Sequence, residues 1–158
     1  MRSIWLTFFC LFAAAAPAHA QGTDAKSKGQ QLYLPIYSEV LHGDADAKGV
    51  PIKTLVSVLV SIRNTDASKS IRVVSAQYYD TAGKKLNNFI KAAQTIGPLG
   101  TYELYVPRNE TAGGSGAKFV ISWQAEAPVN PPYVEALHLN LPSGRSVAFT
   151  TIARPIID

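Results

Sequence analysis

The chain has 158 residues, of which 47% are hydrophobic and 16% are charged, and its formal net charge is +4. This length predicts one domain, and the low share of charged residues excludes an intrinsically disordered chain. A single cysteine excludes a disulfide framework and any zinc or iron–sulfur site built from several cysteines.

The first twenty residues have the pattern of a secretory signal peptide. Arg2 precedes an apolar run over residues 4–16, which Pro17 ends, and Ala18-His19-Ala20 supplies the small residues of a cleavage site. We therefore expect cleavage after Ala20 and a periplasmic or secreted protein. The run is too short to span a membrane and no second long run follows, so we expect no membrane span in the mature chain.

Cleavage would remove the cysteine and the methionine. Cys10 follows two phenylalanines, whereas the cysteine of a lipoprotein signal follows small residues, so we expect it to serve as an ordinary apolar residue of the signal. The mature chain, residues 21–158, loses one positive charge with Arg2. Its chemistry would then depend on His42, His138 and scattered carboxylates.

The mature chain begins with a polar segment. Residues 21–30 predict a flexible leader, followed by a single domain over residues 31–158. Residues 32–37 are the first expected strand, in which Pro35 indicates an edge position or a bulge. Residues 42–51 are polar and predict a loop.

The clearest strand pattern lies over residues 54–64. Apolar β-branched side chains alternate there with other residues, which predicts one buried face. The members of this face are Val56, Val58, Val60 and Ile62. After a turn over residues 64–70, residues 71–80 alternate again. The alternation places Ile71 and Val73 on one face, and Val74, Ala76 and Tyr78 on the other.

The second half of the chain continues as short strands between turns rich in glycine and proline. These strands are expected over residues 86–91, 101–106, 118–124, 133–141 and 147–152. No segment predicts a helix longer than one or two turns, and the only such segment is residues 87–94. Seven to eight strands with regular turns predict an all-β, immunoglobulin-like antiparallel sandwich.

Several stretches resemble exported bacterial proteins. The strand ending at Asn64, the Tyr79-Asp80-Thr81-Ala82-Gly83 turn and the Gly97-Pro98-Leu99-Gly100 turn resemble bacterial immunoglobulin-like domains. A closer resemblance, to an uncharacterised bacterial exported family (domain of unknown function 3124), covers most of the mature chain. The stretches that carry it are residues 32–38, 102–107, 114–119 and 130–135. This resemblance implies export but no activity, so it transfers no catalytic residues.

One segment has the composition of a metal site. If Asp44 and Asp46 took the first and third positions of an EF-hand loop, Lys48 and Leu55 would take the fifth and twelfth, which excludes an EF-hand. A looser site of His42, Asp44 and Asp46, or one that uses His138, remains as an alternative. The protein would then be a small envelope metal-handling protein or hydrolase. On its own strand, His138 falls on the polar side with Asn140, so we expect it to be exposed or locally bonded.

No catalytic motif is present. The glycine-rich loop over residues 108–116 is neither a nucleophile elbow nor a P-loop, because Ala117 replaces the last glycine and a strand follows. Lysines and arginines are scattered, with only Lys84-Lys85 adjacent, which disfavours nucleic-acid binding. We therefore expect no enzyme activity, no cofactor and no nucleic-acid partner.

The expected function is a non-catalytic binding or interaction module in the cell envelope, with a protein or a glycan as its partner. Tyr105 alternates with Tyr102, Leu104 and Val106, so it should face outward, where tyrosine suits recognition. The expected binding surface joins the glycine-rich loop to the bend at residues 130–133. Its members are Tyr105, Arg108, Asn109, Glu110, Asn130 and Tyr133.

Overall fold

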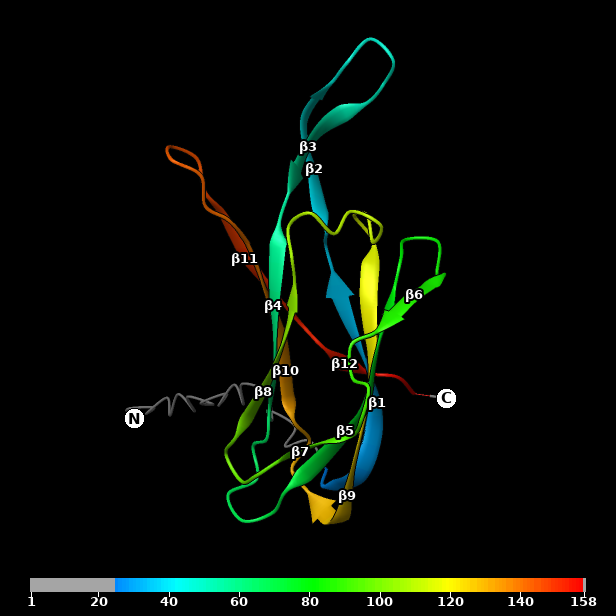
Figure 1. Cartoon of the computed structure of the whole chain (residues 1–158), viewed down its shortest axis with the longest axis vertical. Helices are drawn as coiled ribbons and strands as arrows, with labels where there is room; N and C mark the ends of the chain where they lie inside the picture. The colour runs from blue at the N-terminus through cyan, green and yellow to red at the C-terminus, as the bar shows by residue number, and fades with distance from the viewer. Residues whose placement is uncertain (1–24, 158) are drawn as a thin grey trace, which may run out of the picture.

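The structure is a computed structural model that describes residues 25–157. Within this range every regular element is a strand and every strand pair is antiparallel (Figure 1). The expected all-β sandwich is therefore confirmed. No helix in the described part of the chain is long and apolar enough to cross a membrane. The expected signal peptide and its cleavage site lie outside the described residues.

Two sheets face one another. The larger has the order β12-β1-β9-β5-β6, with β7 also paired to β5, and the second has the order β11-β10-β4-β8. The strands of the larger sheet are β1 (Ser27–Ile36), β5 (Ile71–Tyr79), β6 (Lys85–Asn88), β7 (Gln94–Ile96), β9 (Ala117–Val129) and β12 (Arg154–Pro155). Those of the second are β4 (Ser57–Arg63), β8 (Thr101–Val106), β10 (Tyr133–Asn140) and β11 (Val147–Ile152).

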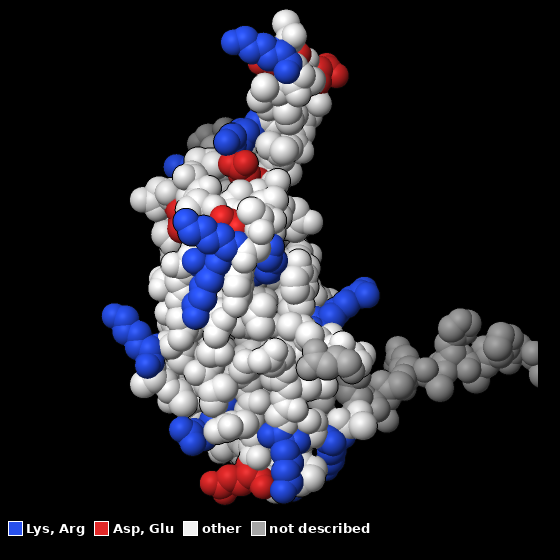
Figure 2. Space-filling view, turned by 90° about the vertical axis from the view of Figure 1, so that its right-hand side faces the viewer, with Lys and Arg blue, Asp and Glu red and all other residues white. Residues whose placement is uncertain are grey.

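A two-stranded hairpin completes the fold and corrects one prediction. Strands β2 (Glu39–Ala45) and β3 (Pro51–Leu55) pair with each other and stand clear of the body in two perpendicular views (Figure 1, Figure 2). Residues 42–45 and 51 of the segment over residues 42–51 are thus strand rather than loop, and residues 46–50 form the turn at its tip. The Asp46 carboxylate accepts hydrogen bonds from the Lys48 and Val50 amides, which closes this turn.

The described residues form twelve strands, not the expected seven or eight. The pattern over residues 54–64 is divided at Val56 into β3 and β4, which adds one strand. The other additional strands are β2 of the hairpin and the short strands β7 and β12. Strand β1 begins at Ser27, so residues 27–30 belong to the sheet and not to a leader. Pro35 lies beyond the two residues of β1 that pair with β12, so no strand pairs with that side of β1 there, as a proline at an edge position predicts.

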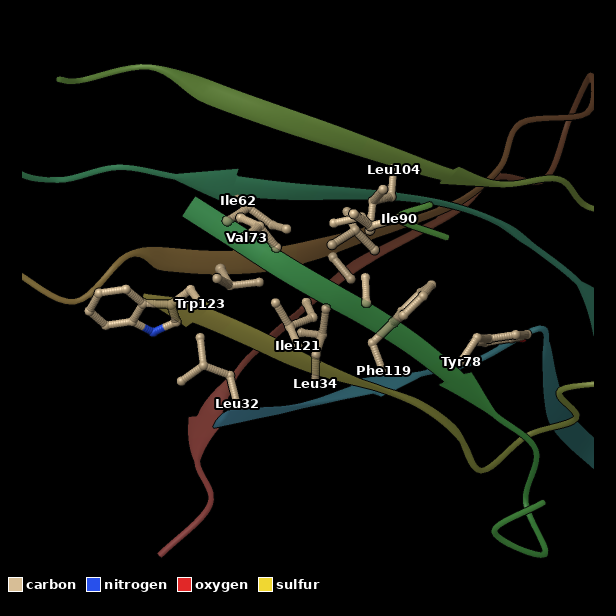
Figure 3. Close-up of a cluster of buried hydrophobic side chains, with 14 of the residues drawn as sticks. Leu32, Leu34, Ile62, Val73, Tyr78, Ile90, Leu104, Phe119, Ile121 and Trp123 are labelled. Carbon is tan, nitrogen blue, oxygen red and sulfur yellow. The ribbon is translucent and has the colours of Figure 1, made fainter. Parts of the chain in front are cut away.

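The hydrophobic core fills the space between the two large sheets (Figure 3). The four residues of the pattern over 54–64 are each 0% exposed, as their alternation predicts. From the opposite sheet, β9 contributes Phe119, Ile121 and Trp123, which the sequence also places on one face. Alternation with period two identifies these residues because each strand buries only one of its two faces.

Strand β5 departs from simple alternation. Its register against β9 shifts between Val73 and Ser75, so Val74 is an extra residue in a β-bulge. The bulge turns Ala76 and Tyr78 to the same buried face as Val73, while Val74 is 36% exposed. The prediction of two apolar faces on this strand is therefore wrong, because the bulge reverses the phase of the alternation.

Strand β10 also differs from expectation. Its buried face is formed by Val134, Ala136 and His138, whereas Leu141 is 65% exposed. The sequence assigned the leucines to one side and His138 to the polar side. In the structure the opposite face is buried, because Val134, Ala136 and His138 lie towards the core.

Replacing Trp123 by alanine is expected to lower the free energy of unfolding by about 3–5 kcal/mol, because the indole is buried at one end of the core and its removal leaves a cavity. Urea denaturation measures this change. Tyr105→Ala is the control, since Tyr105 is 58% exposed, and should cost less than about 1 kcal/mol. Equal midpoints for the two variants would contradict the assignment of Trp123 to the core.

Candidate functional site

The structure does not bring the expected surface residues together. Tyr105, Arg108 and Asn109 are exposed, and the end of β8 and the loop after it lie at the upper end of the sandwich in Figure 1, whereas the bend between β9 and β10, which holds Asn130, lies at the lower end. The 13-residue strand β9 separates the two loops. At a rise of about 3.3 Å per residue this strand spans about 40 Å. The glycine-rich loop and the bend at residues 130–133 therefore do not form one surface.

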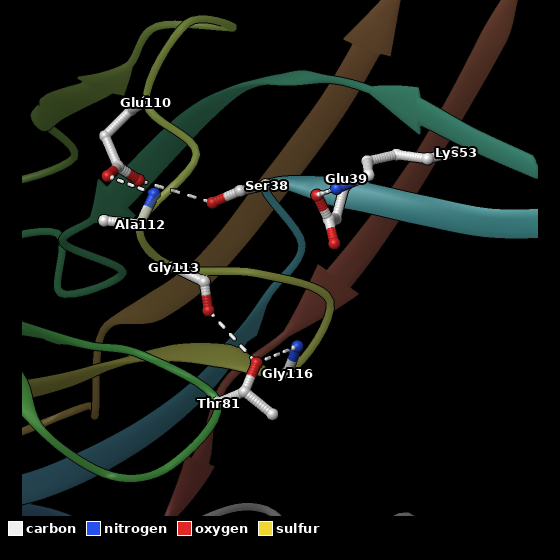
Figure 4. A network of polar contacts seen from close by, with 8 residues as sticks. All are labelled: Ser38, Glu39, Lys53, Thr81, Glu110, Ala112, Gly113 and Gly116. Carbon is white, nitrogen blue, oxygen red and sulfur yellow. Dashed lines mark hydrogen bonds and ion pairs between the residues drawn. The ribbon is translucent and has the colours of Figure 1, made fainter. Parts of the chain in front are cut away.

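The sixth expected residue, Glu110, belongs to the glycine-rich loop and takes part in a polar network between this loop and the sandwich (Figure 4). The Tyr78 hydroxyl donates to Glu110 Oε2 at 2.9 Å, and the Ser38 hydroxyl lies 2.8 Å from the Tyr78 hydroxyl. The Ala112 amide donates to the other carboxylate oxygen at 3.0 Å. Burial, together with the nearby Glu110 carboxylate, raises the pKa of Tyr78, so this phenol stays a donor at neutral pH.

A second set of contacts fixes the other end of this loop. The Thr81 hydroxyl donates to the Gly113 carbonyl and accepts from the Gly116 amide. A Cβ atom at Gly113 would collide with the hydroxyls of Tyr78 and Ser38. Glycine is required there because the loop backbone approaches these buried hydroxyls closely. The polar residues beneath the loop thus hold it against the end of the sandwich.

The residues of the metal alternative are not gathered into one site, because His138 lies on β10 and not on the hairpin that carries His42, Asp44 and Asp46. His42 Nε2 lies 2.8 Å from the Thr54 hydroxyl on the hairpin, and the Asp46 carboxylate is bonded to the amides of its own turn. His138 lies in the core. Among residues 25–157 no group of three or more His, Cys, Asp or Glu side chains is placed to hold a metal ion.

His138 is a buried, neutral histidine. It is 0% exposed, its ring stacks on Phe149 at a centroid distance of 4.4 Å, and its Nε2 accepts from the Tyr37 amide at 3.1 Å. This acceptor role requires the neutral ring to carry its proton on Nδ1. Burial lowers the pKa of His138 to about 4. The expectation of an exposed or locally bonded histidine is therefore replaced by a core residue that ties β10 to Tyr37.

A groove with a volume of about 690 Å³ lies at the lower end of the larger sheet. We call it the basic groove. It is lined by Lys28, Lys69, Ser70, Arg72, Thr95, Gln124, Ala125, Glu126, Ala127 and Val129. Figure 2 shows basic side chains gathered at this end of the molecule, with an acidic side chain beside them.

The cations of the basic groove come from three separate segments. Lys28 belongs to β1, Lys69 to the turn between β4 and β5, and Arg72 to β5. Within the described residues the ion pairs are Lys53 with Glu39 and Arg63 with Glu135, so the groove cations have no carboxylate partner there. Three unpaired cations and one carboxylate, Glu126, leave the groove positively charged.

A tight turn holds Lys69 in place. The Asp66 carboxylate accepts hydrogen bonds from the Ser68 and Lys69 amides at 3.0 Å each, and a longer one from the Asn130 amide. These amide bonds, that of Ser68 foremost, lower the pKa of Asp66 to about 2. Asp66 therefore stays ionised at any ordinary pH and fixes both the turn and the bend at residues 130–133.

A break in strand pairing forms the floor of the groove. In the pairing of β1 with β9, Ser27 lies opposite Val129 and Gly29 lies opposite Gln124, so residues 125–128 bulge opposite Lys28. A Cβ at Gly29 would meet the Trp123 carbonyl at 2.8 Å, which shows how closely the two strands approach at this point. The bulge leaves four consecutive residues of β9 without partners in the register of the sheet.

Sequence reasoning missed the groove. Its cations look scattered because they lie on three segments that only the fold brings together. One signal was present: the strand pattern of β9 loses its apolar alternation after Trp123, where Gln124-Ala125-Glu126-Ala127-Pro128 follows. Side chains of this kind can bind and orient a polar ligand.

The family model for "Protein of unknown function (DUF3124)" matches residues 29–156. A solved structure, the "Crystal Structure of Thermotoga maritima 1070", is similar over 79% of this chain and 92% of its own, with 10% sequence identity and a TM-score of 0.43. No match was found among curated proteins.

His138 predicts a specific dependence of stability on pH. Its pKa is about 4 in the folded protein against 6.5 for the unperturbed group, so the unfolded chain takes up its proton first on acidification. The contribution of the neutral His138 ring to the free energy of unfolding is intact above pH 6.5. It is lost as pH falls towards 4, by about 3 kcal/mol in all.

The measurement is urea denaturation of the wild type and of His138→Gln at several pH values between 4 and 7. The carboxylates titrate in both proteins, so the difference isolates the histidine. We expect the wild type to lose about 3 kcal/mol more than the variant over this range. Parallel pH profiles for the two proteins would rule out a buried neutral histidine.

Proposed function

The chain belongs to the family of proteins of unknown function DUF3124, and on that premise we propose that it is an exported, non-catalytic binding module of the cell envelope. The observation that carries this proposal is the basic groove. Its lining combines unpaired cations with amide and hydroxyl side chains in a hollow of about 690 Å³. Sites for small ligands in proteins commonly have volumes of about 300–1,000 Å³.

The absence of catalysis is supported by the roles that reactive side chains already have. Ser38, Tyr78 and Glu110 bond to one another and to the loop backbone, and Ser38 and Tyr78 are no more than 1% exposed. His138 is buried and accepts from a backbone amide. A catalytic group must reach its substrate, and these groups are committed to holding the fold.

The alternative of a metal-handling protein or a hydrolase has no comparable support. His42, Asp44 and Asp46 belong to the exposed hairpin and are not gathered as a ligand set in the described residues. Export is proposed from the N-terminal sequence pattern, which ends in Ala18-His19-Ala20. A folded domain without a cysteine after residue 20 suits an oxidising compartment, because it has no thiol to oxidise there.

The binding function is tested by removing the charges of the basic groove. The triple variant Lys28→Gln, Lys69→Gln and Arg72→Gln is purified from a periplasmic fraction, where its mass should match a chain that begins at Gln21. The protein is immobilised and exposed to soluble envelope material, and the retained carbohydrate and protein are quantified. We expect retention to fall at least about tenfold, because the loss of several charge contacts costs well over 1.4 kcal/mol.

The matched control removes three lysine charges elsewhere, with Lys48→Gln, Lys84→Gln and Lys85→Gln. Lys48 is exposed on the hairpin, Lys84 just before β6 and Lys85 at the start of β6, so the control keeps the groove intact at the same net charge. It should retain as much material as the wild type. Equal retention by the groove variant and the wild type would overturn the proposed function.

A further inference from the structure

The charges of the basic groove are arranged for an oxyanion. Lys28, Lys69 and Arg72 have no ion pair among residues 25–157, so their charge is available to a ligand. The Lys69 ammonium donates to the Pro128 carbonyl at 3.2 Å, which orients the side chain over the groove floor and leaves two N–H groups for a ligand. Arginine presents a planar fork of donors that matches carboxylate and phosphate groups.

The uncharged part of the lining suits hydroxyl groups. Ser70, Thr95 and Gln124 each offer both a donor and an acceptor, and the Glu126 carboxylate adds an acceptor. A ligand that was only an anion would gain nothing from Glu126, whereas a ligand that also carries hydroxyl groups can donate to it. The lining therefore favours a polyol that bears a negative group.

The apolar part of the lining has the size of a sugar ring face. Ala125 and Ala127 are small and partly exposed and form a patch on which C–H groups can pack, whereas Val129 is buried beneath the groove. No aromatic side chain lines the groove, so it offers no platform for stacking nucleobases. The patch is also interrupted by charged residues, which disfavours an acyl chain.

We propose that the basic groove binds an acidic saccharide, that is, a carbohydrate carrying a carboxylate or a phosphate group. This proposal rests on the binding function proposed above and adds the ligand class to it. The cations bind the oxyanion, the carboxylate and hydroxyl side chains bind the sugar hydroxyls, and the alanines contact the ring. The volume of about 690 Å³ accommodates a segment of a few sugar units at most.

The test is isothermal titration of the purified chain with four probes. Digalacturonate carries carboxylates and glucose 6-phosphate carries a phosphate, while α-1,4-galactobiose and glucose are their uncharged counterparts. We expect at least one acidic probe to bind at least about tenfold more tightly than its neutral counterpart. Binding of digalacturonate alone identifies a carboxylated saccharide, and binding of glucose 6-phosphate alone identifies a phosphorylated one. Both outcomes support the proposal.

Two variants tie the binding to this groove. Arg72→Gln should lower the affinity for the acidic probe at least about tenfold, because a charge-assisted contact is lost. Lys85→Gln removes the same charge from β6 and should leave the affinity unchanged. Both substitutions are at exposed positions, so urea midpoints equal to that of the wild type confirm that the fold is retained. Affinity should also fall as the salt concentration rises, since the groove is open to solvent.

Three results would overturn the ligand class. These are the absence of heat with both acidic probes at concentrations of about 1 mM, equal affinity for acidic and neutral probes, and equal affinity for single-stranded oligothymidylate. The last result would indicate an unselective polyanion surface. If one of these results is obtained but the triple groove variant still retains less envelope material than the wild type, only the ligand class is wrong. If that variant retains material like the wild type, the proposed binding function fails as well.

Discussion

The pairing of β9 with both of its neighbours is the interaction on which the rest of the structure depends. This 13-residue strand is the middle strand of the larger sheet, and its inward side chains form the centre of the core. Where its pairing with β1 loses register, residues 125–128 bulge outward and form the floor of the basic groove. The core and the candidate site therefore both depend on this one strand.

The polar residues at the other end of the sandwich serve the fold. Ser38, Tyr78 and Glu110 satisfy one another where the larger sheet meets the loop over residues 108–116. An unpaired hydroxyl or carboxylate in that position would cost stability, so the three groups are best understood as a unit. The glycine-rich loop closes the sandwich over them, and the cations of the basic groove lie at the opposite end.

Period-two alternation predicted the strands and most of the core, because a half-buried sheet imposes that pattern on its sequence. It failed at Val74, where one extra residue reverses the phase, and at His138, whose polarity suggested the wrong face. Neither event has a local signal, since bulges and the choice of buried face are set by neighbouring strands. The sequence did not predict the basic groove for a related reason. Lys28, Lys69 and Arg72 are brought together only by strand pairing and by the turn that Asp66 fixes.

We propose that the lower end of the larger sheet, and not the glycine-rich loop, is the binding surface of this protein. Chemical-shift mapping of backbone amides during titration with digalacturonate or glucose 6-phosphate tests this claim most directly. The account predicts that the shifts concentrate at Lys69, Arg72 and residues 124–127. Shifts confined to residues 108–116 at the opposite end of the sandwich would contradict it.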